Sequence, residues 1–177
     1  MKKALFGILC VLIVAACHDV RKQKQLDQLS TLNTILVNIQ QQVDSIDIVA
    51  WNQTRASTQE TRRIIKANYT TDDTISLEFA QKLENYKAIE VNLSHFEKER
   101  EQFLEALQRA RNAVKLLRND VENSQGDRNA YDKNIAIEKK RVTELANYFA
   151  QWLETKTKCV NSYHDLHPTI LEFTKSL

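Results

Sequence analysis

Residues 86–121, with the sequence YKAIEVNLSHFEKEREQFLEALQRARNAVKLLRNDV, decide the fold class of this 177-residue chain. Apolar side chains recur in this stretch at alternating spacings of three and four residues, from Tyr86 to Val121. That spacing is typical of a long helix packed along a seam. Two further series, within 29–50 and 131–166, follow the same pattern. The sequence therefore predicts an all-α protein with coiled-coil-like packing.

The scarcity of glycine and proline supports this prediction. The chain has two glycines and one proline. Tight turns, sheets and phosphate-binding loops depend on these residues. The composition therefore argues against a Rossmann fold, a P-loop enzyme, a β-sandwich and most α/β hydrolases.

Polar stretches divide the pattern into segments. Asp73 or Thr74 is a candidate N-cap after the first polar run. Gly126 suits the C-terminus of the second helix, and Asp127 or Asn129 is a candidate N-cap for the third. Pro168 is expected to end or kink the last helix, leaving a short terminal helix in 169–177. The predicted helices are 20–67, 74–123 and 128–166.

Short connections make sequential helices antiparallel neighbours. The sequence therefore predicts an elongated, antiparallel, up-down-up three-helix bundle. An intermolecular coiled coil of the same helices, and thus a homo-oligomer, is the alternative. The charged residues Glu138 and Lys156 occupy positions of the third series, and we expect their long side chains to reach solvent.

The N-terminus has the pattern of an export signal. Lys2 and Lys3 precede a nearly unbroken apolar run over 4–16, which has the length of a secretory signal core. The run ends in Val14-Ala15-Ala16-Cys17, which resembles the lipobox of bacterial lipoproteins. The resemblance implies cleavage before Cys17 and attachment of acyl chains such as palmitate to it.

This resemblance also predicts the domain organisation and the location. Residues 1–16 would be a cleaved signal peptide, 17–25 a lipid-anchored tether and 26–177 a single helical domain. His18 instead of aspartate after the cysteine implies an outer-membrane lipoprotein facing the periplasm, with a cell-surface location as the alternative.

Cleavage would change the charge and the cysteine content. It removes Lys2 and Lys3 from the 25 basic residues and none of the 23 acidic ones, which leaves 23 of each. A neutral chain lacks the basic surface that nucleic-acid binding requires, so we expect no nucleic-acid partner. Cys159 would be the remaining unmodified cysteine. Its place in the apolar series predicts a buried thiol, with an intermolecular disulfide as the alternative.

Familiar catalytic patterns are missing from the sequence. No histidine follows a glutamate at three residues, as di-iron bundles require, and no His-Glu-x-x-His or paired-cysteine pattern occurs. We therefore expect no enzyme activity and no cofactor besides the covalent lipid on Cys17.

One region combines polar and aromatic residues. In an up-down-up arrangement, the first and second predicted helices meet where residue numbers sum to about 142, and the second and third where they sum to about 252. The first helix loses its apolar series over 52–62, opposite about 80–90 and 162–172. The resulting candidate partner-binding patch is Gln53, Arg55, Gln59, Tyr86, Tyr163, His164 and His167. A loosely packed, solvated tip is the alternative.

The sequence thus predicts a membrane-anchored envelope lipoprotein that acts as a non-catalytic scaffold or protein-interaction module for an envelope protein partner. An alternative is a ligand or metal carrier that uses His164 and His167, whose spacing can place both imidazoles on one helix face. The intermolecular coiled-coil assembly is the third possibility.

Overall fold

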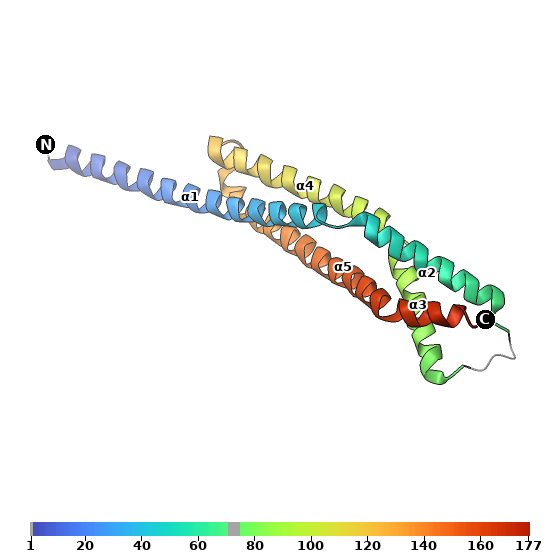
Figure 1. Ribbon diagram of the computed structural model, residues 1–177. Coiled ribbons are helices and arrows are strands. Elements are labelled where there is room, and N and C mark those ends of the chain that lie inside the picture. The colour runs from blue at the N-terminus through green and yellow to red at the C-terminus, as the bar shows by residue number, and fades with distance from the viewer. Residues whose placement is uncertain (1, 71–74) are drawn as a thin grey trace. The chain divides into compact units, whose positions relative to one another are not determined.

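The structure is a computed structural model that describes residues 2–70 and 75–177, with side chains from residue 20 onward. Within these residues the chain is helical and has no strand, which confirms the all-α prediction. The elements are α1 (Lys2–Asp44), α2 (Ile48–Asn68), α3 (Leu77–Leu93), α4 (Phe96–Asn123), the 3-10 helix η1 (Arg128–Ala130) and α5 (Tyr131–Thr174) (Figure 1). The Cys17 side chain, and with it the predicted lipid attachment, lies outside the described residues. Among the described residues, no helix is long and apolar enough to cross a membrane.

The prediction of three helices was wrong, because two of them are interrupted. The first predicted helix breaks over 45–47, where the Asp47 side chain accepts a hydrogen bond from the Ala50 backbone N–H at 2.9 Å and caps α2. Aspartate at this position satisfies a donor that has no partner inside the helix. The apolar series runs across the break through Ile46 and Ala50, which concealed it.

The second predicted helix is interrupted at Ser94. The Ser94 hydroxyl donates to the Val91 carbonyl at 2.7 Å, and the Ser94 N–H reaches the same carbonyl at 3.3 Å. A serine side chain that bonds nearby backbone competes with the regular helix ladder. At the other end of α3, Ser76 is the N-cap, while the predicted caps Asp73 and Thr74 fall outside the described residues.

Pro168 lies inside α5, so the expectation that it ends the third helix, with a separate short helix behind, was wrong. The alternative, a kink at Pro168, stays a prediction. Proline lacks the N–H that would donate to the His164 carbonyl, and its ring crowds that carbonyl. Packing holds the segment beyond it, because Ile170 is fully buried and the Phe173 ring lies 4.6 Å from that of Phe79. These contacts let the helix continue to Thr174.

The turn between α4 and α5 contains the predicted glycine, but the left-handed residue directly after α4 is Ser124, with a φ of +55°. Gly126 has a φ of +74° three residues beyond the end of α4, a conformation that favours glycine. The Asp127 side chain caps η1 by accepting from the Asn129 N–H at 3.0 Å. The Tyr131 hydroxyl then donates to the Asp120 carbonyl at 2.9 Å, which ties the start of α5 to the end of α4.

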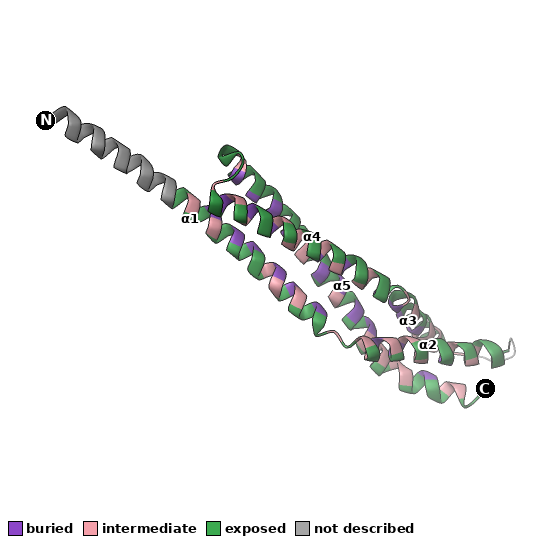
Figure 2. Ribbon diagram, turned by 90° about the horizontal axis from the view of Figure 1, so that it is seen from above, coloured by how far each residue is buried: buried purple, intermediate pink, exposed green. Residues whose placement is uncertain are grey.

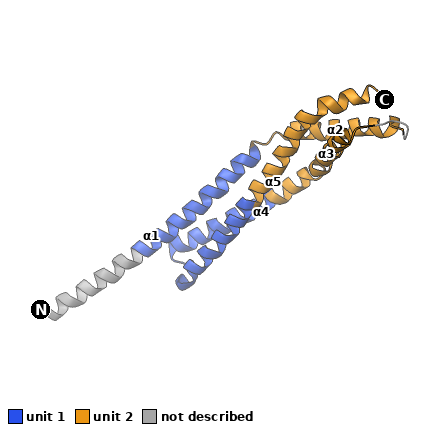
Figure 3. Cartoon of the chain, turned by 90° about the horizontal axis from the view of Figure 1, so that it is seen from below, with its two compact units in different colours: residues 1–44, 104–147 blue, residues 45–103, 148–177 orange. Residues whose placement is uncertain are grey.

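The chain divides into two compact units (Figure 3). Unit 1 comprises residues 1–44 and 104–147, and unit 2 comprises residues 45–103 and 148–177. Helices α4 and α5 contribute to both. The predicted single domain, 26–177, covers parts of both units and stays a prediction.

In unit 1, α1 packs against parts of α4 and α5, with the apolar series on the buried faces (Figure 2). The expected tether takes part in this packing. The Gln25 side chain is 5% exposed and donates to Asp132 at 2.6 Å, and Arg21 forms an ion pair with the same carboxylate at 2.6 Å. The fully buried core residues on the three elements include Leu29, Leu36, Val43, Leu107 and Val142.

In unit 2, α2 and α3 pack with the C-terminal part of α5. The rings of Phe103 and Phe149 stack with centroids 4.8 Å apart. Their positions confirm the predicted antiparallel register between the second and third helices. The prediction of a buried Cys159 thiol is also confirmed, and burial raises the pKa of this thiol.

Candidate functional site

Helix α2 carries a buried stripe of threonines where the sequence indicated a loss of the apolar seam. Thr54, Thr58 and Thr61 are 6%, 0% and 4% exposed, and they continue the spacing set by Trp51. Threonine presents a methyl group to the core, and its hydroxyl can bond the preceding helical turn. The Thr58 hydroxyl does so, donating to the Thr54 carbonyl at 2.8 Å. The expected loss of the seam over 52–62 was therefore wrong, because threonine maintains it.

An aromatic cluster lies against this stripe. It consists of Tyr86 from α3 with Tyr163 and His167 from α5. The ring centroids of Tyr163 and His167 are 4.5 Å apart, and those of Tyr86 and His167 are 5.9 Å apart. Both pairs are stacked. The antiparallel register predicted for the second and third helices therefore placed the correct residues next to one another.

Hydrogen bonds connect this cluster across three helices. The Tyr86 hydroxyl lies 2.6 Å from Nδ1 of His167, and the Tyr163 hydroxyl donates to Ser57 on α2 at 2.8 Å. Burial raises the pKa of Tyr86, while hydrogen bonding to Thr61 and Thr58 acts in the opposite direction. Burial lowers the pKa of His167. The polar atoms of the cluster therefore hold α2, α3 and α5 to one another.

The seven predicted residues separate into a packed group and a surface group. Tyr86 is fully buried, Tyr163 and His167 are half-buried, and the exposed His164 ring lies edge-on to Tyr163 at 5.6 Å. Gln53 and Gln59 are exposed on α2 and Arg55 is half-buried, so the structure does not bring these three into the ring cluster. The partner-binding role of all seven stays a prediction.

The first helix is displaced from its expected register. Asn52 donates to Glu97 at 2.8 Å, although position 90 was expected opposite it. Arg62 forms an ion pair with Glu90, although position 80 was expected. The offset is about two helical turns or more. Both pairings are centred near Ser76, the N-cap of α3, instead of near residue 71.

A second polar centre was missed by the sequence analysis. Lys156 is 5% exposed, and its ammonium lies 2.7 Å from the Glu99 carboxylate while also donating to the Asn92 carbonyl. The indole N–H of Trp152 donates to the same carboxylate at 2.8 Å. Burial by itself raises the pKa of Glu99, but the bonds from Lys156 and Trp152 outweigh it, so the pKa lies below its usual value.

The expectation that Lys156 reaches solvent was therefore wrong, and so was that for Glu138, which is 8% exposed and paired with Arg141 at 2.6 Å. The sequence does contain a signal for the ion pair of Lys156 with Glu99. The confirmed register places Lys156 opposite position 96, about one turn from Glu99. A charged residue in a seam, with an opposite charge within a turn across it, indicates a buried ion pair.

The proposed metal ligands have other partners. Nδ1 of His167 lies within hydrogen-bond distance of Tyr86. In the described part of the chain, no group of three or more His, Cys, Asp and Glu side chains is placed to hold a metal ion. The polar atoms of the ring cluster therefore serve the packing of helices. Exposed polar groups lie on the surface beside it.

Comparisons of the chain with protein family models, with curated proteins and with solved structures find no match.

Proposed function

We propose that this chain is a lipoprotein of a bacterial cell envelope, anchored by acyl chains on Cys17, and that its helical part is a non-catalytic scaffold for a protein partner. The observation that carries the proposal is Val14-Ala15-Ala16-Cys17, placed directly after a charged and apolar export signal. Two or three acyl chains give stable anchoring where a single chain does not. The outer membrane, with the protein facing the periplasm, is the proposed location.

Coiled-coil-like packing supports the scaffold role. Within each unit we propose an up-down-up path of three helical stretches. Its support in unit 1 is the set of bonds that join Arg21 and Gln25 of α1 to Asp132 of α5, together with the tight turn from α4 to α5. Long packed helices present side chains at fixed positions, as a protein-interaction module requires.

We propose that the partner docks on the surface of unit 2 beside the ring cluster. The exposed side chains there are Gln53 and Gln59 on α2 and His164 on α5, with Arg55 half-buried. The packed rings of Tyr86, Tyr163 and His167 support this surface from below, because their hydrogen bonds fix α2 and α5. Pre-ordered side chains lose less entropy on binding.

The anchor is tested by metabolic labelling with an alkyne fatty acid. Labelling of the wild-type protein and its loss in Cys17→Ser are expected, with the intact mass reporting cleavage before Cys17. Labelling that persists in Cys17→Ser, or a mass that retains residues 1–16, contradicts the proposal.

The docking surface is tested by photocrosslinking in cells. A photoreactive residue at Gln59 or His164 should capture a defined protein, and the same residue at Gln108, which is exposed on α4 in unit 1, should not. The double variant Gln59→Ala, His164→Ala should weaken capture from a probe at Gln53 without loss of helicity. Equal capture from Gln108, or capture unchanged in the double variant, contradicts this surface.

A further inference from the structure

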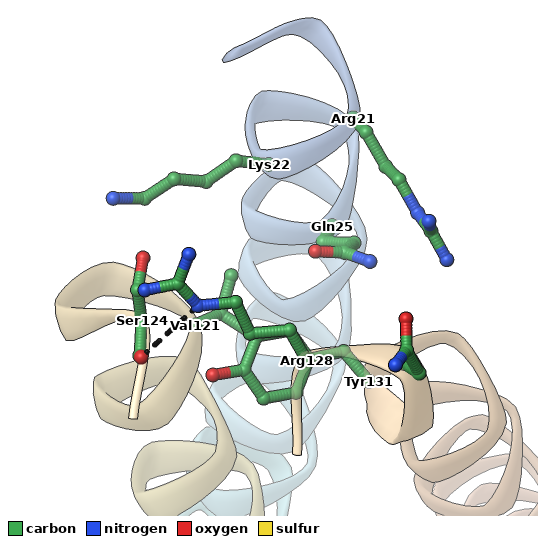
Figure 4. Close-up of a pocket in the computed structure, with 8 residues that line it drawn as sticks. Arg21, Lys22, Gln25, Val121, Ser124, Arg128 and Tyr131 are labelled. Carbon is green, nitrogen blue, oxygen red and sulfur yellow. Dashed lines mark hydrogen bonds between the residues drawn. The ribbon is translucent and has the colours of Figure 1, made fainter. Parts of the chain in front are cut away.

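A basic hollow lies in unit 1 between α1 and the turn that joins α4 to α5 (Figure 4). Its volume is about 200 Å³. Among the residues whose side chains the structure describes, three cations line it and no carboxylate residue does, while amide and hydroxyl groups supply further polar atoms. The cations are Arg21, Lys22 and Arg128, and the neutral polar groups include Gln25, Ser124 and Asn129.

Hydrogen bonds hold the cations in place. Lys22 donates to the Glu122 carbonyl at 2.7 Å, and Nε of Arg128 donates to the Ser124 carbonyl at 3.2 Å. The acceptor of Lys22 is neutral, so this bond orients the ammonium without cancelling its charge. An ammonium carries three N–H groups, so Lys22 keeps donors for an anion.

The side chains approach the hollow from two directions. In Figure 4, Lys22 extends over the side where Arg128 reaches Ser124, and Arg21 extends on the other side, with Gln25 between them. The Asp132 carboxylate accepts from both Nε and Nη2 of Arg21, at 3.2 and 2.6 Å, and offsets the charge of this guanidinium. The N–H groups that remain on Arg21 are the ones that can meet a phosphate oxygen.

The short distance between the hollow and Cys17 along the sequence indicates which kind of ligand it would meet. Arg21 and Lys22 follow Cys17 by four and five residues. A helix rises about 1.5 Å per residue, so they lie about 6–8 Å along α1 from the residue proposed to carry the acyl chains. Because those chains enter the bilayer, the hollow would stand at the height of the lipid phosphates.

We propose that this hollow binds the phosphate of an anionic phospholipid headgroup, with Lys22 and Arg128 on one side and Arg21 on the other. The choice of a lipid as the source of the phosphate rests on the proposed anchor, whereas the cationic chemistry does not. Bound lipid orients unit 1 on the membrane, since it adds a second contact to the acyl chains on Cys17.

The test measures melting of the natural, membrane-extracted protein in a non-ionic detergent. Added phosphatidylglycerol should raise the melting temperature by about 2–4 °C once the lipid exceeds its dissociation constant about fivefold. Phosphatidylcholine should leave it unchanged. Inorganic phosphate forms a separate arm, and a rise as large as that given by phosphatidylglycerol would overturn the headgroup as the source.

Charge-removing variants locate the effect. Lys22→Gln and Arg128→Gln should each lose most of the rise, which is measured against the same variant without lipid. Lys24→Gln is the matched control, because this residue is exposed on α1 and does not line the hollow. A rise that is kept in the first two variants, or lost equally in the control, overturns the proposal.

The experiment distinguishes an error in the proposed acylation of Cys17 from an error in the proposed phosphate binding by the hollow. The intact mass of each sample reports acyl chains on Cys17 before melting is measured. An acylated protein that does not respond to phosphatidylglycerol overturns the hollow and leaves the anchor standing. A response specific to phosphatidylglycerol in a protein without acyl chains supports the hollow and contradicts the anchor.

Discussion

The hydroxyl of Tyr86, a fully buried residue of α3, lies 2.6 Å from Nδ1 of the half-buried His167 of α5. The two rings also stack, with centroids 5.9 Å apart. A neutral imidazole can accept a hydrogen bond from the hydroxyl at Nδ1, whereas imidazolium has only donors. The contact therefore couples the protonation of one side chain to the packing of two helices.

Stability should fall as the pH is lowered through the range in which His167 gains its proton. Burial places the pKa of His167 below its usual value of 6.5 in the folded protein. The unfolded chain then binds more protons, so the stabilisation is present above pH 6.5 and is lost as the pH falls through the folded pKa. Melting followed by circular dichroism between pH 7.5 and 5.5 checks this.

His167→Gln should flatten that pH dependence, because glutamine does not titrate and can still accept from Tyr86. His164→Gln is the matched control, since this histidine is exposed. An unaltered slope in His167→Gln, or an equal flattening in His164→Gln, would show that another group is responsible.

Lys156→Met should destabilise the protein by about 1–3 kcal/mol, because the partly buried Glu99 carboxylate loses its cation. The exposure of the Glu99 side chain, 31%, places the effect below that of a fully buried pair. In a domain of this size the melting temperature falls by about 2–4 °C for each kcal/mol. Urea unfolding provides the free energy.

Lys158→Met removes the same charge two residues away, where the side chain is 73% exposed. It should change stability by less than about 0.5 kcal/mol. If Lys156→Met and Lys158→Met lower the free energy of unfolding equally, the buried ion pair contributes no more to stability than a surface charge does.

Gly126→Ala should cost about 1–2 kcal/mol, since a φ of +74° is strained for a residue with a side chain. Apart from the two neighbouring residues, no atom of the described chain lies within 4 Å of the position that a Cβ would take, so we assign the effect to backbone strain. Urea unfolding measures the loss. Gly126→Asn should recover part of it, because asparagine tolerates this conformation, while Gln125→Ala should be nearly neutral. A Gly126→Ala protein as stable as the wild type would refute the assigned turn.

Much of the ring cluster could be predicted from the sequence. The antiparallel register follows from the turn at Gly126 and placed Tyr86 level with Tyr163 and His167. Ser57 was not found, because its partner depends on how α2 is placed. The offset of Asn52 towards Glu97 shows the same difficulty. The pairing of α2 with α3 is centred near the Ser76 cap, and the apolar spacing does not indicate where that cap lies.

By itself, the sequence determined that the chain is helical and which faces of its helices are buried, because the spacing of apolar side chains follows the helical repeat. It also determined the turn at Gly126, where only local backbone conformation is involved. Tertiary structure alone decided that the threonines of α2 form part of the core and that Lys156 is buried. Both outcomes depend on partners distant in the chain, since a polar group can be buried only where another segment supplies its hydrogen bond or opposite charge.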